Sequence, residues 1–183
     1  MSKSWMPAWA VCGLGLLAAA PPAAADPDFP DLSSYNAVAA DAYIAPMGYG
    51  NGGVRFSTPD GLHCALIRNV RGGWSSASCT GNLPGITGFN AVTASSSSQG
   101  TWSKQDLSKP ETYQSLNTDG WHTTAVDPAS YRPLPAGSKI EYEDGTCAVD
   151  ATGQTACIVT GSQYVPPLPD HGFILKPDGS QHF

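Results

Sequence analysis

Basic side chains are scarce in this 183-residue chain, which has nine Lys and Arg against fifteen Asp and Glu. They form no cluster, whereas proteins that bind nucleic acid neutralise phosphates with grouped Lys and Arg. The same scarcity disfavours attraction to anionic lipid headgroups. The sequence therefore predicts no nucleic-acid partner, and its acidic balance favours solubility.

Long apolar runs are also missing, and the best of them, Ala8 to Ala20, is too short to span a bilayer. Lys3 precedes it and the small residues 23–25 follow it, a pattern typical of a secretory signal peptide cleaved before Asp26. A retained membrane anchor is the competing interpretation. We predict that residues 1–25 are a signal peptide, that the mature chain has no membrane span, and that the protein is secreted or held in the cell envelope.

Cysteine is infrequent, and no C-x-x-C pair is present. Cys12 falls in the predicted signal peptide, which leaves four cysteines: Cys64, Cys79, Cys147 and Cys157. An even number in an oxidising compartment favours two disulfides, although four cysteines allow three pairings. We favour the two local pairings, 64 with 79 and 147 with 157, because each joins segments with the character of neighbouring strands. A metal site is the rival interpretation, but thiolates oxidise readily outside the cell, so we expect no metal or cofactor.

Removal of the predicted signal peptide leaves 158 residues with a net charge of −7, a size that fits one domain. From residue 54 to 183 the chain consists of short apolar or alternating runs separated by Pro, Gly, Asn and Asp. These runs cover 54–57, 62–67, 89–94, 138–143, 146–150, 155–160, 172–176 and 180–183. The Asp-Gly pairs at 60–61, 144–145 and 178–179 are suited to tight hairpins. The pattern predicts an all-β fold, mainly an antiparallel sandwich or small barrel stabilised by two disulfides.

The segments outside these runs are predicted to form helix, connector and loop. Apolar residues at helical spacing between Leu32 and Tyr43 predict one short N-terminal helix, and the glycines at 48–53 predict a connector, so that residues 26–53 precede the β domain. We expect a polar loop at 93–101, a turn of helix from Ser108 to Leu116 with Glu111 completing a capping box, and an extended proline strap at 164–169.

Catalytic motifs are absent: the chain has no G-x-S-x-G elbow and no H-E-x-x-H pair. The weak candidates for a hydrolase assembled from distant residues are His63, His122, Asp170 and His171. His63 is next to Cys64 on a predicted strand, so we expect its ring to face solvent if the cysteine enters the core. The acidic residues permit a glycosidase pair but identify none.

Several aromatic residues lie in or near polar segments: Trp74, Trp102, Trp121, Tyr131 and Tyr164. Exposed rings of this kind would suit a glycan-binding module, for which Trp74, Trp102 and Trp121 are the weak candidate residues. The competing interpretation is that the rings cover the ends of the β core.

Four stretches, at 29–35, 56–64, 134–142 and 170–173, carry a resemblance to small exported actinobacterial proteins, particularly mycobacterial ones. The resemblance implies export and disulfides and assigns no chemistry. We therefore expect a secreted or envelope-associated, non-catalytic binding or structural module with an unknown envelope or extracellular macromolecule as partner. An envelope hydrolase and a glycan-binding module are the alternatives.

Overall fold

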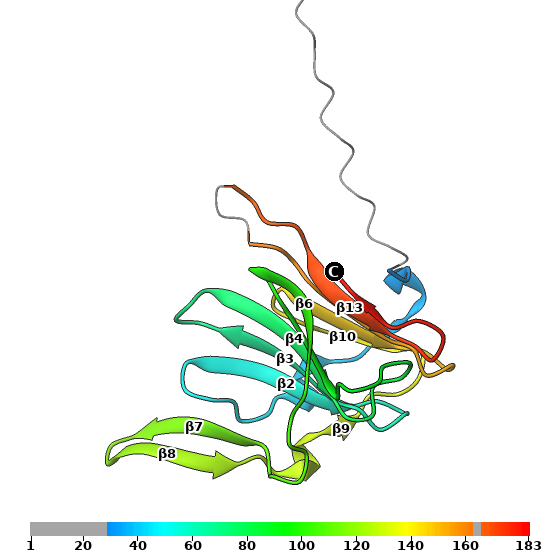
Figure 1. The fold of residues 1–183 in the computed structure, drawn as a ribbon. Coiled ribbons are helices and arrows are strands. Elements are labelled where there is room, and N and C mark those ends of the chain that lie inside the picture. The colour runs from blue at the N-terminus through cyan, green and yellow to red at the C-terminus, as the bar shows by residue number, and fades with distance from the viewer. Residues whose placement is uncertain (1–28, 163–165) are drawn as a thin grey trace, which may run out of the picture.

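The computed structural model describes residues 29–162 and 166–183 and shows two six-stranded sheets packed face to face (Figure 1). Sheet A contains, in spatial order, β1 (Asn36–Ala37), β10 (Ser138–Tyr142), β11 (Gly145–Val149), β12 (Thr155–Val159), β13 (His171–Leu175) and β14 (Gln181–His182). Sheet B contains β6 (Ser98–Ser103), β5 (Ala91–Ser95), β4 (Trp74–Thr80), β3 (His63–Asn69), β2 (Asn51–Ser57) and β9 (Arg132–Pro133). A separate hairpin of β7 (Thr112–Asn117) and β8 (Gly120–Ala125), here called the arm, lies beside β2.

Within the sheets, neighbouring strands are antiparallel except at the short pairs β1–β10 and β2–β9. The predicted all-β, mainly antiparallel fold class is thus confirmed, and of the two forms left open, sandwich or small barrel, the structure has two packed sheets. Among the residues that the structure describes, no helix has the length and apolar character needed to cross a membrane. The predicted signal peptide, with Cys12, lies outside the described residues.

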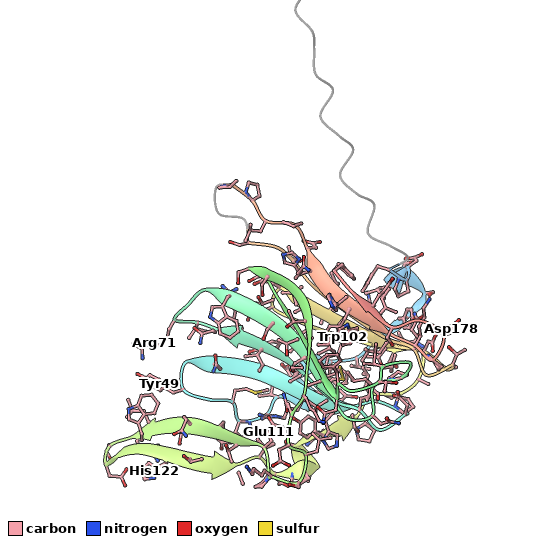
Figure 2. All side chains as sticks on the ribbon, in the orientation of Figure 1. Tyr49, Arg71, Trp102, Glu111, His122 and Asp178 are labelled. Carbon is pink, nitrogen blue, oxygen red and sulfur yellow. A yellow bond between two sulfur atoms is a disulfide. The ribbon has the colours of Figure 1, made fainter. Side chains whose placement is uncertain are left out.

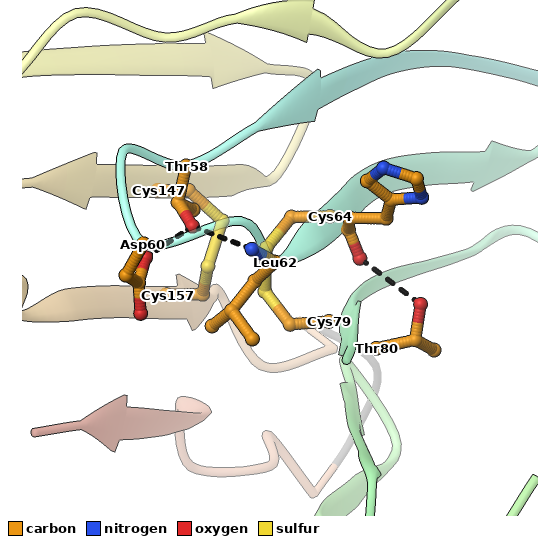
Figure 3. The surroundings of a disulfide bond; sticks show 9 residues. Thr58, Asp60, Leu62, Cys64, Cys79, Thr80, Cys147 and Cys157 are labelled. Carbon is orange, nitrogen blue, oxygen red and sulfur yellow. Dashed lines mark hydrogen bonds between the residues drawn. A yellow bond between two sulfur atoms is a disulfide. The ribbon is translucent and has the colours of Figure 1, made fainter. Parts of the chain in front are cut away.

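Both predicted disulfides are present, and each joins directly opposed residues of neighbouring strands. Cys64 pairs with Cys79 across β3 and β4 of sheet B, and Cys147 pairs with Cys157 across β11 and β12 of sheet A. All four cysteines belong to the buried core between the sheets (Figure 3). Side chains fill this space along the length of the sandwich, with Phe56 and Phe173 among the largest that are fully buried (Figure 2).

The three predicted Asp-Gly hairpins are also present, between β2 and β3, between β10 and β11, and between β13 and β14. A fourth Asp-Gly pair, Asp119-Gly120, which the prediction missed, closes the arm between β7 and β8. In the first, the Thr58 hydroxyl donates to Asp60 and accepts the Leu62 N–H at 3.0 Å (Figure 3). Gly61 there has a φ of 87°, a left-handed conformation that glycine adopts without steric cost.

The prediction of one N-terminal helix was wrong. Two 3₁₀ turns, η1 (Leu32–Ser34) and η2 (Ala40–Tyr43), flank the short strand β1 instead. The backbone N–H groups of Asn36 and Val38 donate to Gly137 and Lys139, so bonding to sheet A interrupts the helical pattern. The predicted glycine connector is shorter than expected, because β2 begins at Asn51.

Two central predictions were also wrong. The serine-rich stretch at 93–101 forms most of the β5–β6 hairpin, where an edge strand with one solvent-facing side tolerates polar residues. No helix forms at 108–116; Glu111 is bonded to Arg55 rather than to a helix end, and β7 begins at the next residue. A third 3₁₀ turn, η3 (Pro128–Ser130), follows the arm. In the predicted strap, residues 166–169 are exposed and form neither helix nor strand, and Tyr164 lies outside the described residues.

Removal of either disulfide is expected to destabilise the sandwich by about 2–4 kcal/mol, because each bond restricts the unfolded chain. The sequence separations are 15 and 10 residues, so the two losses should be nearly equal. Urea unfolding of the double variants C64A/C79A and C147A/C157A measures both losses. An unchanged free energy of unfolding in either variant would contradict this account.

Candidate functional site

A hollow of about 750 Å³ lies over the outer face of sheet B. Because Cys64 and Leu66 of β3 point into the core, the alternate residues of that strand point outward. The floor of the hollow consists of these residues and their neighbours on β4 and β5: His63, Ala65, Ile67, Ser78, Thr80 and Thr93. Most of these side chains are small, which leaves the space above the sheet open.

One wall of this hollow is the crossing segment, residues 104–111, which leads from β6 at one edge of sheet B to the arm beside β2 (Figure 1). Asn90 fixes its first end by accepting the Gln105 N–H at 2.7 Å and donating to the Gln105 carbonyl at 2.9 Å. Between the ends, Asp106 accepts hydrogen bonds from the backbone N–H and the hydroxyl of Ser108 and forms an ion pair with Lys109. Hydrogen bonds therefore hold the segment to sheet B at Gln105. A second attachment is at Glu111.

Glu111 bonds to a buried arginine. Arg55 is only 3% exposed, and its guanidinium donates to the Pro46 carbonyl and to Glu111 Oε1 at 3.0 Å. The Tyr131 hydroxyl donates to the other oxygen of Glu111. A buried guanidinium requires an anionic partner, so this contact both neutralises Arg55 and holds the crossing segment against the sheet.

The same cluster ends in an aromatic stack. The Arg55 guanidinium lies 5.7 Å from the centroid of the Tyr131 ring, and the exposed His63 imidazole stacks on that ring at 4.2 Å with an interplanar angle of 12°. Burial, followed by the hydrogen bond to Glu111 and the charge of that residue, raises the pKa of Tyr131 well above its usual value. The phenol thus remains a donor to Glu111, and the imidazole borders the hollow.

A second hollow of about 370 Å³ separates the arm from sheet B. It shares Ile67 and Glu111 with the first, so the two hollows are neighbours over the outer face of sheet B, and we call the pair the groove. Tyr49 and Trp121 line its arm end, and Figure 2 shows Tyr49 between the arm and Arg71. Their rings meet edge to face at 5.1 Å, and the Arg71 guanidinium lies 4.8 Å from the Tyr49 ring centroid.

The four candidate catalytic residues lie on different parts of the molecule. His63 is in the groove on β3, His122 is on the arm, and His171 is on β13 of sheet A. Asp170 accepts the Gly161 N–H at 2.8 Å. His122 does meet a carboxylate, Asp119, at 2.8 Å, but the pair is at the exposed end of the arm, with the side chains 43% and 70% exposed.

The candidate aromatic residues divide between core and surface. Trp102 packs against the core and lies edge-on to His182 at 5.1 Å. Trp74 and Trp121 are 38% and 61% exposed. Because Tyr49 and Trp121 meet at 84°, the rings at the arm do not form a flat platform. Over the two described ranges, no group of three His, Cys, Asp or Glu side chains is placed to hold a metal ion.

Sequence reasoning missed Tyr49, Arg55 and Glu111 as parts of the site. The one available signal was Arg55, a charge between Val54 and Phe56 in an otherwise apolar run, which in a buried strand requires a partner. The partner lies 56 positions away, and nothing local in the sequence identifies it.

Comparison with known proteins gave no match among family models, curated proteins or solved structures.

The Glu111→Ala change is expected to lower the free energy of unfolding by about 1–3 kcal/mol, because it leaves the buried Arg55 guanidinium without an anion. Glu141→Ala is the matched control: its carboxylate pairs with Lys139 at the surface, and its loss should cost less than about 1 kcal/mol. Urea unfolding of both variants measures the two losses in the free energy of unfolding. Equal losses would show that the Arg55–Glu111 pair does not anchor the crossing segment.

Stability should also fall at high pH through Tyr131. Folding raises the pKa of this phenol above its unfolded value near 10. The contribution of Tyr131 to the free energy of unfolding is therefore complete below pH 10 and is lost as the pH rises beyond it. The free energy of unfolding measured from pH 8 to 11 should therefore decrease less in Tyr131→Phe than in the wild type. Parallel curves for the two proteins would contradict the assignment.

Proposed function

We propose that this protein is an exported, envelope-associated binding module without catalytic activity, and that its ligand is a glycan held in the groove. The observation that carries the proposal is the groove itself, two neighbouring hollows over a sheet face with small hydroxyl side chains. Export is supported by the two disulfides, which form in oxidising compartments, and by the predicted signal peptide.

The lining chemistry favours a glycan. Sugar hydroxyls both donate and accept hydrogen bonds, and Ser78, Thr80 and Gln105 offer both capacities. The His63 and Trp121 rings add apolar faces suited to the C–H faces of a sugar ring. The lining of the groove thus combines rings and aliphatic side chains such as Leu107 with hydroxyl and amide groups.

An extended peptide fits the groove less well. Peptides commonly bind by adding a strand to a free sheet edge. The groove lies over the face of sheet B, and edge strand β6 is already bonded to the C-terminus, since the Gly100 N–H donates to the Phe183 carbonyl at 2.9 Å.

The surroundings of the groove carboxylates favour binding over hydrolysis. A glycosidase needs a carboxylic acid that stays protonated, which requires a raised pKa. The pKa of Asp106 is instead lowered, chiefly by hydrogen bonds from Ser108. Both oxygens of Glu111 accept hydrogen bonds from Arg55 and Tyr131, which holds this carboxylate as an anchor.

Filling the groove should abolish binding. Thr93 is an exposed floor residue, and Thr93→Trp is expected to weaken binding at least tenfold on an array of glucans, mannans, galactans, arabinans and xylans. The matched control is Thr146→Trp. Thr146 precedes the core residue Cys147 on β11, so its side chain lies on the outer face of sheet A, and this variant should bind like the wild type.

Three results would overturn the proposal. The first is the absence of wild-type binding to every glycan on the array. The second is equal binding by wild type and Thr93→Trp, and the third is retention of a tryptic casein peptide pool in place of glycans.

A further inference from the structure

We infer that the ligand is a linear oligosaccharide chain that occupies both hollows at once, with Trp121 stacking on the sugar unit farthest from His63. This inference rests on the proposed glycan-binding function and adds the length of the ligand and a second subsite.

The size of the groove indicates an extended ligand. The first hollow alone, at about 750 Å³, lies within the roughly 300–1,000 Å³ typical of pockets for one small molecule. The second adds about 370 Å³, and together they exceed that range. Ile67 and Glu111 line both hollows, so the hollows border each other at these two residues, and the proposed chain would cross from one to the other over them.

Trp121 is positioned for stacking before any ligand binds. Its indole is 61% exposed, yet its place is set by edge-to-face contact with the Tyr49 ring. The Arg71 guanidinium covers that ring, and the Tyr49 N–H donates to the Gln114 carbonyl of β7 at 2.7 Å, which ties the arm to the loop before β2. A large ring held in this way presents apolar surface to a ligand at a low cost in side-chain entropy.

The polar lining of the second hollow suits the same ligand class. Asn51 and Gln114 lie with Trp121 around it, and amide groups can donate to and accept from sugar hydroxyls. The arm end thus repeats the combination found at the His63 end, a ring beside neutral hydrogen-bonding side chains. Two such ends separated by Ile67 and Glu111 are what a chain of several sugar units would contact.

The test is the dependence of affinity on chain length. Oligosaccharides of two to eight units from the five polysaccharides of the array are titrated into the protein, and dissociation constants are measured by calorimetry. For the series that binds, wild-type affinity should rise at least tenfold from two units to six or more. Trp121→Ala should remove this gain. Trp74→Ala, which removes an exposed indole outside both hollows, is the matched control and should keep the gain.

The outcomes separate the two proposals. Binding with no length dependence, or a gain that survives in Trp121→Ala, overturns the extended ligand and leaves the glycan-binding function standing. Loss of the gain in Trp74→Ala as well would place the second subsite elsewhere and contradict the role of Trp121. If no chain of any length binds, the proposed function itself fails.

Discussion

The burial of one disulfide in each sheet, between two packed sheets, is the constraint on which the rest of this structure depends. Cys64 and Cys79 must point into the core, and the alternation of side chains along a strand then sends their neighbours outward. His63 and Thr80 stand on the outer face of sheet B for this reason. The floor of the groove is therefore a consequence of how the core is closed.

A second consequence follows from Arg55, which the same alternation places on the outer face between two core residues. Its guanidinium is almost fully buried, and burial of a lone charge is too costly for a stable fold. Glu111 supplies the opposite charge from a distant part of the chain, and this contact draws the crossing segment across the sheet. A wall is thereby added to a floor of small side chains. The Arg55–Glu111 ion pair thus contributes both to the stability of the sandwich and to the position of one wall of the groove.

The strands that carry apolar or alternating runs, three Asp-Gly hairpins and the disulfide pairing could be predicted, because each depends on residues close together in sequence. Strands β4, β6, β7 and β8 were among those not predicted, because their sequences are rich in Ser, Thr, Gln and Gly and contain no apolar run. The same local reasoning failed where a distant partner decided the outcome. The apolar residues around Asn36 have helical spacing, but hydrogen bonds to β10 make that segment a strand. Ser108 and Glu111 have the spacing of a capping box, but Arg55 binds the carboxylate. Sequence analysis named His63 and Trp121, but Tyr49 and Glu111 were missed for the same reason, since they line one hollow with Trp121 only through the placement of the arm.

The measurement that tests the central claim most directly is a map of backbone amide chemical shifts on addition of a glycan retained by the protein. The account predicts that the largest changes follow the groove, from His63, Thr80 and Thr93 past Glu111 to Trp121. Changes concentrated on the outer face of sheet A, around Thr146 and Ile158, would contradict it and place the binding surface on the opposite side of the sandwich.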